Sequence, residues 1–293
     1  MRTIIPGTIP TKDFHQFILG TIAPRPIAFV STLDAAGRPN LAPYSFFNCF
    51  SSNPPIVVFS SNRRVRNNTT KDTLHNLRET GECVINSVSY EIVRQMAVCS
   101  VEFPAGVSEF EKSGLTPMPS EHVRPPRVKE SKSHMECRLR EIVPLGDQGG
   151  AGHLIICDVI CIHISESVIG EKDRIDPHKM DLMGRMGRAY YVRASGDAIY
   201  TIPQAVERLT IGYDQIPPSI RQSTLLTGNQ LGLLAGMEAM PSEEARAAAL
   251  GIPDVRALLA EKAIPALHAL AGIYLDRGDV EQGAAILWLA DQL

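Results

Sequence analysis

Side chains that could hold a ligand gather between residues 25 and 48, in a stretch that is otherwise apolar and β-branched. They are Ser31, Thr32, Asn40, Tyr44, Ser45 and Asn48. Hydroxyl and amide groups need hydrogen-bond partners once they leave water, and a purely structural pair of strands would bury fewer of them. The simplest source of such partners is a ligand with many hydrogen-bonding atoms that lies across this stretch.

Two strands and a turn are expected to position these groups. Residues 25–33 predict the first strand, because Pro24 and Pro26 fix their own φ and hold the residues before them extended. Residues 41–50 are rich in aromatic side chains and predict the second strand. Between them lie Asp34 and Gly37, which suit a tight connection. The stretch is therefore predicted to be a β-hairpin.

A further polar segment follows a short apolar strand predicted at residues 56–59. The strand leads directly into Ser60, Ser61, Asn62, Arg63 and Arg64. Hydroxyl and guanidinium groups at the end of a strand, just before a helix, suit an anion.

That helix is predicted over residues 71–80, with Thr70 as its N-cap and Gly81 as its stop. The free N–H groups at a helix start bind anions, and Lys71 and Thr73 add further donors. By residue type alone, an anion site and a capped surface helix with solvated charges both remain open, and the surface helix is the simpler of the two.

The predicted hairpin carries the pattern P-R-P-I-A-F-V-S-T-x-D-x-x-G-x-x-N-x-A-P-Y-S-F-F-N, which closely resembles the flavin reductase-like family of FMN-binding split barrels. The resemblance runs over about residues 10 to 200. It implies a mainly β protein with helices, namely a six-stranded antiparallel FMN-binding split barrel. It also implies a homodimer with FMN at the interface. The K-D-T segment at 71–73 belongs to the resemblance, so the phosphate interpretation of the helix start is preferred.

With the resemblance, the polar residues acquire roles toward FMN. The isoalloxazine ring is expected to lie against Ser31, Thr32, Tyr44, Ser45, Phe46, Phe47 and Asn48. The phosphate is expected to be held by Ser60, Ser61, Arg63, Lys71 and Thr73. Arg25 would place positive charge near the ring and favour the anionic reduced flavin, or else form a salt bridge at the dimer interface.

A second informative stretch, IDPHKMDLMGRMGRAYY, covers residues 175–191. In the family a histidine and a G-R-x-G-x-x-Y segment lie here beside the flavin. By resemblance, the flavin or nicotinamide pocket would include His178, Arg185, Gly187, Arg188 and Tyr191, with His178 and Arg188 assigned to it first. Ordinary strand packing is an equal alternative for the tyrosines. Asp176, His178 and Asp181 are too few to predict a metal site.

Composition sets the broad class. Of 293 residues, 44% are hydrophobic and 21% charged, and the net charge is −3, which gives no general drive toward nucleic acid or an anionic membrane. No apolar segment is long enough to predict a transmembrane helix, and the N-terminal residues lack the apolar region of a signal peptide. The six cysteines have no C-x-x-C spacing and are expected to be buried thiols. A cytoplasmic protein is predicted.

The composition changes after residue 202, where alanine, leucine and glutamate replace β-branched residues. A barrel domain over residues 1–202 and an all-α C-terminal extension over 203–293 are predicted. Helices are expected at 219–239, 242–250, 254–276 and 280–292, with a kink at Pro265. The extension lies outside the resemblance, and its apolar faces are expected to pack on the barrel, on the second subunit or on a protein partner.

The predicted activity is transfer of reducing equivalents from NADH or NADPH through FMN to free flavin or another acceptor. Hydride transfer requires positioning of two rings and exclusion of water, rather than a side-chain nucleophile or acid–base pair. Two alternatives stay open: an electron carrier of the flavoredoxin type with a protein donor, and a non-catalytic flavin-binding module whose helical extension recruits a partner.

Overall fold

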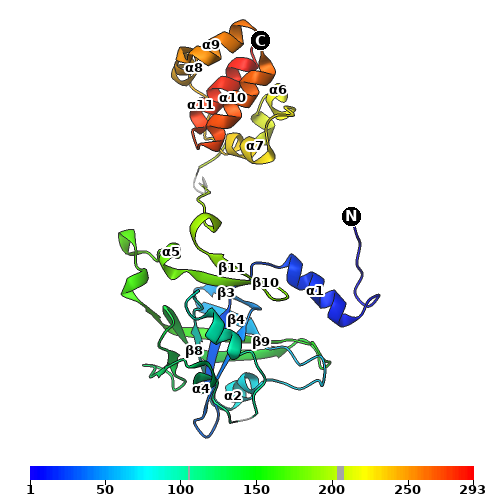
Figure 1. Cartoon of the computed structure of the whole chain (residues 1–293), viewed down its shortest axis with the longest axis vertical. Helices are drawn as coiled ribbons and strands as arrows, with labels where there is room; N and C mark the ends of the chain where they lie inside the picture. Colours follow the sequence, from blue (N-terminus) through cyan, green and yellow to red (C-terminus); the bar gives the residue numbers. More distant parts are fainter. Residues whose placement is uncertain (105, 203–207) are drawn as a thin grey trace. The chain divides into compact units, whose positions relative to one another are not determined.

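The computed structural model describes residues 1–104, 106–202 and 208–293. These residues form two compact units, Met1–Tyr200 and Thr201–Leu293. Each unit is described by itself below, and Figure 1 labels the helices and strands of both.

The first unit is built on a seven-stranded antiparallel sheet with the strand order β2-β1-β5-β8-β9-β4-β3. The strands are β1 (Ala28–Leu33), β2 (Pro39–Tyr44), β3 (Phe47–Ser52), β4 (Pro55–Ser60), β5 (Glu82–Asn86), β8 (Ser133–Pro144) and β9 (His153–Ile164). The resemblance implied six strands, and the sheet has one more. The mainly β class with helices is confirmed.

The sheet curls on itself at a corner between β2 and β3. These two strands stand at opposite ends of the strand order, yet only Ser45 and Phe46 separate them in the chain. Tyr44 and Phe47 are three residue steps apart, which is roughly 11 Å at most, so these ends of the two edge strands must come close together. The backbone N–H of Ser60 at the end of β4 donates to the carbonyl of Phe46 at 2.8 Å, which holds the corner. The result is a barrel with one open seam.

This corner corrects the predicted hairpin. Residues 41–50 are two strands rather than one, and only the first of them pairs with β1, in a register that sets Ala28 opposite Tyr44. The second, β3, pairs with β4 and sets Phe47 opposite Phe59. Polar residues predicted to lie along one hairpin are therefore divided between two edges of the sheet.

Helix α2 (Asp72–Thr80) covers β1 and β2 and explains why β1 is buried almost throughout. Its Leu74 and Leu77 pack with Val30, Phe59 and other apolar residues of the barrel core. The helix ends at Gly81, whose φ of 69° suits glycine, as predicted. Its N-cap is Lys71 rather than Thr70, and no side chain caps it.

The remaining elements of the first unit lie around this barrel. They are the helices α1 (Thr11–Thr21), α3 (Val93–Val98), α4 (Glu109–Ser113) and α5 (Pro177–Met180), the strand pairs β6 (Pro117–Met118) with β7 (Arg127–Val128) and β10 (Leu182–Gly187) with β11 (Tyr190–Ala194), and the 3-10 turns Glu166–Val168, Glu171–Asp173 and Gly196–Ala198.

The second unit is helical, as predicted. It contains α6 (Pro218–Arg221), α7 (Gly228–Ala235), α8 (Glu243–Gly251), α9 (Pro253–Ala260), α10 (Ile264–Asp276) and α11 (Val280–Ala290), preceded by a 3-10 turn at Tyr213–Gln215. Two of the predicted helices are each divided into two. Thr227 and Gln230 form a capping box that starts α7 separately, and Pro265 stands in the first turn of α10 instead of kinking a longer helix.

A hydrophobic core belongs to the second unit itself. It includes Leu267, Leu275 and Leu287 from α10 and α11. These helices approach closely, since a Cβ placed on Gly283 would lie 2.9 Å from Leu275 Cδ2. Within residues 1–104, 106–202 and 208–293, no helix has both the length and the apolar character needed to cross a membrane.

Candidate functional site

The ends of β2 and β4 and the start of α2 bring four of the predicted site residues together. Lys71 Nζ lies 4.7 Å from the centroid of the Tyr44 ring. Thr73, in the first turn of α2, accepts a hydrogen bond at 3.0 Å from the amide of Asn40 on β2. The Tyr44 hydroxyl lies near the hydroxyls of Thr73 and Ser61. The structure thus places Tyr44, Ser61, Lys71 and Thr73 in one group.

Lys71 and Thr73 of this group line a cavity of about 140 Å³, which we call the α2 cavity. It is lined by Asn40, Ala42, Arg64, Lys71, Asp72, Thr73, Cys99, Ser100, Val101, Glu102, Phe103 and Glu109. The volume is well below the several hundred Å³ of a site that encloses a whole cofactor. A small group of a larger ligand suits this volume better.

The charge of Lys71 is only partly compensated. Burial lowers the pKa of Lys71, the nearby charge of Arg64 lowers it further, and Glu102 opposes both. Among the described residues, no carboxylate oxygen lies within 4.0 Å of Lys71 Nζ. Glu102 is instead paired with Arg64 at 3.2 Å and with Arg66. A bound anion would stabilise the charged form of this lysine.

Arg64, rather than the predicted Arg63, lines the α2 cavity. The Nε of Arg63 donates to Asn68 Oδ1 at 2.6 Å and its Nη2 donates to the carbonyl of Asn68 at 2.8 Å, so its side chain is directed into the loop after β4. Arg64 donates to the carbonyl of Thr70 at 2.6 Å and faces the cavity. Arg63 and Arg64 are adjacent in a loop, and nothing in the sequence indicates which of the two side chains faces the cavity.

Three predicted residues bury hydroxyls without a hydrogen-bond partner in the described part of the chain. They are Ser31, Tyr44 and Ser61. Burial raises the pKa of Tyr44 to about 12, although the hydroxyls of Thr73 and Ser61 lie close enough to lower it in part. Neither of those hydroxyls meets Tyr44 Oη with hydrogen-bond geometry. Unpaired buried hydroxyls are costly, and a ligand with acceptor atoms would satisfy them.

Two other predicted hydroxyls are already engaged. Ser60 Oγ donates to Asn62 Oδ1 at 2.9 Å. Thr32 Oγ1 accepts from the amide of Asn76 on α2 at 3.0 Å. Of the predicted pair at the end of β4, Ser61 is therefore the residue whose hydroxyl has no hydrogen-bond partner in the described part of the chain.

The corner residues Ser45 and Phe46 meet Arg25, while Phe47 and Asn48 continue onto β3. Arg25 Nε lies 3.4 Å from Ser45 Oγ, and its guanidinium lies 5.9 Å from the centroid of the Phe46 ring. Asn48 is exposed, and its Oδ1 accepts from the neighbouring backbone N–H at 2.8 Å. The guanidinium of Arg25 therefore lies beside the corner between β2 and β3, and not beside one continuous strand as predicted.

Arg25 has a structural partner that the sequence did not predict. It is 4% exposed, and its Nη1 donates to the carbonyls of Leu19 and Ile22 at the end of α1, at 2.7 and 2.6 Å. Burial lowers its pKa, and the charge of Arg185 lowers it further. Backbone hydrogen bonds of 2.9 Å in both directions join Arg25 to Arg185 on β10.

His178 and Arg188 have no contact with the α2 cavity among the described residues. His178 is exposed on α5, where Asp176 caps the helix by accepting from the His178 N–H at 2.8 Å. Arg188 is exposed in the turn between β10 and β11, with a φ of 48°. Arg185 and Tyr191 lie together, the guanidinium 4.5 Å from the ring centroid. Arg185 is joined to Arg25 by backbone hydrogen bonds, and Met183 and Tyr191 pack in the hydrophobic cluster that contains Ile27 and Phe29.

Comparison with known proteins agrees with this architecture. The profile of the flavin reductase like domain matches residues 20–179, which include the hairpin, the corner and the start of α2. The chain belongs to the flavin reductase-like family. A member of similar sequence is an uncharacterised protein of Aquifex aeolicus, 40% identical over 183 residues, or 62% of this chain and 91% of that protein.

Two solved structures are similar to this chain. The crystal structure of nitrilotriacetate monooxygenase component B from Bacillus cereus is 33% identical and covers 69% of this chain and 98% of that one, with a TM-score of 0.64. The 2-nitrobenzoate 2-nitroreductase NbaA of Pseudomonas fluorescens is 29% identical, with a TM-score of 0.61 over 70% of this chain and 98% of that one. A split-barrel protein from Shewanella frigidimarina NCIMB 400 is 25% identical over 68% of this chain and 95% of that one, with a TM-score of 0.58, which confirms the split-barrel fold.

Proposed function

We propose that this member of the flavin reductase-like family binds FMN and transfers reducing equivalents from NADH or NADPH to free flavin or another acceptor. The observation that carries the proposal is the group at the start of α2. In the described part of the chain, the half-buried Lys71, which has no carboxylate within 4.0 Å, lines the α2 cavity together with Arg64 and Thr73, and the buried hydroxyl of Ser61 has no hydrogen-bond partner. These donors fit the phosphate of FMN, and Lys71, Arg64, Ser61 and Thr73 would hold it.

Bound FMN supplies the chemistry, because its ring accepts and returns hydride or single electrons. The chain itself would bind and orient that ring. The corner at Ser45 and Phe46 adjoins the buried guanidinium of Arg25, which adds fixed positive charge beside the ring position. Tyr44, whose pKa is raised by burial to about 12, stays neutral at physiological pH and can donate a hydrogen bond. None of these roles requires a side-chain nucleophile.

A homodimer is part of the proposal. Ile160, Ile162 and Ile164 are exposed at alternate positions of β9, so they share one face of that strand. Phe50 on β3 is also exposed. A second copy that covered these side chains would remove apolar surface from water and could complete a flavin site at the barrel seam.

A cytoplasmic location remains a prediction, supported by the thiols. All six cysteines are free, and four of them are buried, namely Cys83, Cys99, Cys137 and Cys157. Unpaired buried thiols are typical of proteins from reducing compartments.

The helical unit favours a second candidate function. Residues 201–293 form a compact unit with a core of its own, which a bare reductase barrel does not need. The barrel could then act as a flavin-binding carrier or module, with the helices recruiting a protein partner that donates or accepts electrons.

Anaerobic reduction of the flavin-loaded protein separates these candidates. If the protein is a reductase, stoichiometric NADH or NADPH bleaches the absorbance of bound flavin within seconds. Reduction by dithionite but by neither nicotinamide would reject the reductase proposal and favour a carrier or module. Failure of the purified protein to bind FMN at all would reject every flavin role.

A further inference from the structure

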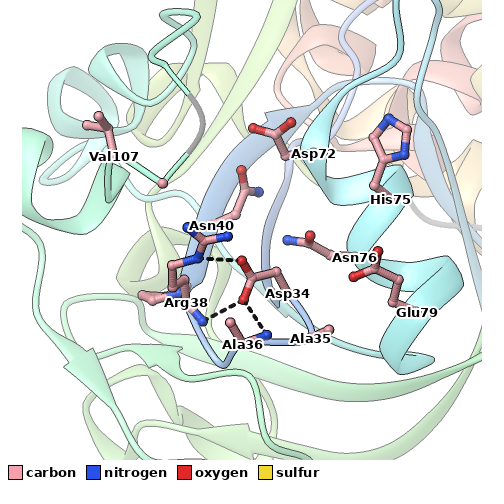
Figure 2. Close-up of a pocket in the computed structure, with 12 residues that line it drawn as sticks. Asp34, Ala35, Ala36, Arg38, Asn40, Asp72, His75, Asn76, Glu79 and Val107 are labelled. Atoms are coloured by element: carbon pink, nitrogen blue, oxygen red, sulfur yellow. Dashed lines mark hydrogen bonds and ion pairs between the residues drawn. The ribbon is translucent and has the colours of Figure 1, made fainter.

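A larger cavity of about 370 Å³ lies between the turn that joins β1 to β2 and the outer face of α2 (Figure 2). We call it the turn cavity. It is lined by Asp34, Ala35, Ala36, Arg38, Pro39, Asn40, Asp72, His75, Asn76, Glu79, Gly106 and Val107. It is distinct from the α2 cavity, but Asn40 and Asp72 line both. A ligand that reaches past these two residues would occupy both spaces.

Two amides, of the buried Asn76 and the half-buried Asn40, give the turn cavity defined hydrogen-bonding groups. Asn76 is 6% exposed, and its Nδ2 donates to Thr32 Oγ1 at 3.0 Å, which fixes the side chain. The side-chain oxygen of Asn76, Oδ1, has no hydrogen bond among the described residues, whereas its backbone carbonyl accepts from Thr80 Oγ1 at 2.8 Å. Asn40 is fixed in the same way by its bond to Thr73. Figure 2 shows both amides beside the space between α2 and the turn.

The charge of the turn cavity is acidic, even though one of its carboxylates is neutralised. Asp34 accepts from the backbone N–H groups of Ala36 and Arg38 at 3.0 and 2.8 Å and pairs with the Arg38 guanidinium at 2.6 Å. The Arg38 backbone N–H is the main reason that the pKa of Asp34 is lowered. In the described part of the chain, Asp72 and Glu79 have no ion pair. The cavity therefore disfavours phosphate and suits hydroxyl or amino groups.

From this arrangement we infer that the turn cavity binds an adenosine unit whose ribose 2′-hydroxyl is free, with the 5′-phosphate directed past Asn40 toward the α2 cavity. Carboxylates recognise ribose hydroxyls in dinucleotide sites, and a 2′-phosphate in their place is repelled. Glu79 would act in this way, with Asn76 as an acceptor for the adenine amino group or a ribose hydroxyl. The inference rests on the proposed function only in taking Lys71 as the phosphate site.

Two ligands of flavoenzymes, FAD and NADH, contain this unit. Both would present the same adenosine 5′-phosphate with a free 2′-hydroxyl to the turn cavity. If FAD is the source, its FMN half would lie at the barrel corner and its AMP half in the turn cavity. If NADH is the source, the cavity would select it over NADPH, which carries the 2′-phosphate.

Calorimetric titration of the full-length protein with AMP and with adenosine 2′,5′-bisphosphate tests the inference, because these probes differ only in the 2′-phosphate. The wild type is expected to bind AMP at least about tenfold more tightly, the effect of losing one charge-assisted hydrogen bond and gaining repulsion. Glu79→Lys should bring the two affinities together or reverse their order. Lysine suits this position in the last turn of α2, so the variant is expected to fold.

Two further variants complete the test. Glu111→Lys makes the same change at an exposed helical glutamate that lines neither cavity, and it should leave the AMP preference unchanged. Asn76→Leu should weaken AMP binding about tenfold, through the loss of a buried acceptor. Asn76→Leu also removes the hydrogen bond to Thr32, so the folding of this variant is checked by circular dichroism. If Asn76→Leu does not fold, the result for Glu79→Lys alone tests the inference.

Separate titrations identify the source. If the adenosine unit belongs to FAD, the wild type binds FAD more tightly than FMN, and Glu79→Lys reduces the difference between the two affinities. With NADH as the source, Glu79→Lys raises the KM for NADH and lowers that for NADPH on the FMN-loaded protein. Absence of AMP binding, or an AMP preference that Glu79→Lys does not move, overturns the inference. Failure of FMN itself to bind the wild type is a different result and overturns the proposed function.

Discussion

Tyr44 shows how a single residue can report on a missing ligand. Its hydroxyl is buried without a hydrogen bond among the described residues, and its ring lies under the ammonium group of Lys71. Such a hydroxyl costs stability in the free protein, and it would contribute binding energy once a ligand accepts from it. Removal of the hydroxyl is therefore expected to stabilise the free protein and to weaken binding of the ligand.

Tyr44→Phe is expected to leave the free protein as stable as the wild type or up to about 1 kcal/mol more stable, because an unsatisfied polar group is removed. It should weaken FMN binding about tenfold, the effect of one lost hydrogen bond. Urea unfolding measures the first effect and quenching of flavin fluorescence the second. Unchanged FMN affinity would exclude a role of this hydroxyl at the flavin.

Glu136 is a buried carboxylate that organises a loop outside the candidate site. It is fully buried and accepts from the backbone N–H groups of Glu121, His122 and Val123 at 2.8, 2.6 and 3.1 Å, and it meets His163 Nε2 at 2.7 Å. Burial raises its pKa, but the N–H groups of Glu121 and His122 and the bond to His163 outweigh that effect and hold the pKa below its usual value.

A depressed carboxylate pKa stabilises the fold above the ordinary pKa of about 4.3, and the stabilisation is lost as the pH falls through the lower folded value. Glu136→Gln should therefore lower the unfolding free energy at pH 7 by about 1–3 kcal/mol and flatten its decline below about pH 4. Denaturant unfolding as a function of pH measures both. The exposed Glu141→Gln serves as the control, and an identical acid profile in the two variants would contradict the assignment.

Among elements, α1 depends on one side chain of the barrel. The carbonyls of Leu19 and Ile22 at its end receive hydrogen bonds from Arg25 Nη1. Carbonyls at a helix end have no partner within the helix, so this guanidinium supplies what the helix lacks. The side chain is buried beside Arg185, and its charge is held there by these acceptors.

Arg25→Lys keeps the positive charge but cannot reproduce the planar guanidinium geometry. We expect a loss of about 1–3 kcal/mol in unfolding free energy and faster proteolysis within α1. Limited proteolysis with mass spectrometry, beside a thermal melt, measures both effects. Wild-type behaviour of Arg25→Lys in both assays would contradict the role of Arg25 in holding the end of α1. Only the proposed electrostatic role toward the flavin would then remain.

The elements were predictable where local chemistry decides them. Gly81 ends α2 because only a residue that tolerates positive φ fits there, and Ser242 caps α8 by accepting from the N–H of Ala245. The corner at Ser45 and Phe46 was not predictable, because residues 41–50 are continuously strand-forming and the turn is set by the closure of the barrel. Likewise Pro265 suits both a kink and a helix start, and only tertiary packing selects between them.

At the scale of the whole molecule, the chain consists of two units that each have a hydrophobic core. The two clusters of the first unit draw on residues 27–191, and the cluster of the second draws on residues 211–290. The change of composition after residue 202 predicts a barrel domain over residues 1–202 and a helical extension over residues 203–293. The family pattern assigns Lys71 and Thr73 to the phosphate, and the position of Ser61 at the end of a strand adds that residue. The same reasoning assigns Arg63, whereas Arg64 lines the α2 cavity.

Truncation after Tyr200 is expected to leave a folded first unit that binds FMN with wild-type affinity, because its clusters contain no residue of the second unit. Residues 208–293 alone should retain helical circular dichroism and a cooperative melt. Loss of FMN binding in the truncated protein would mean that the helical unit contributes to the flavin site.

The account depends most on an anion site at the start of α2, and FMN and riboflavin differ only by the phosphate that this site would bind. Their affinities can be compared by fluorescence quenching in the wild type, in Lys71→Ala/Thr73→Ala and in the exposed control Lys129→Ala. We predict that the wild type and the control bind FMN at least about tenfold more tightly than riboflavin, and that the double variant loses this preference with riboflavin affinity unchanged. Equal binding of FMN and riboflavin by the wild type, or an FMN preference that persists in the double variant, would contradict it.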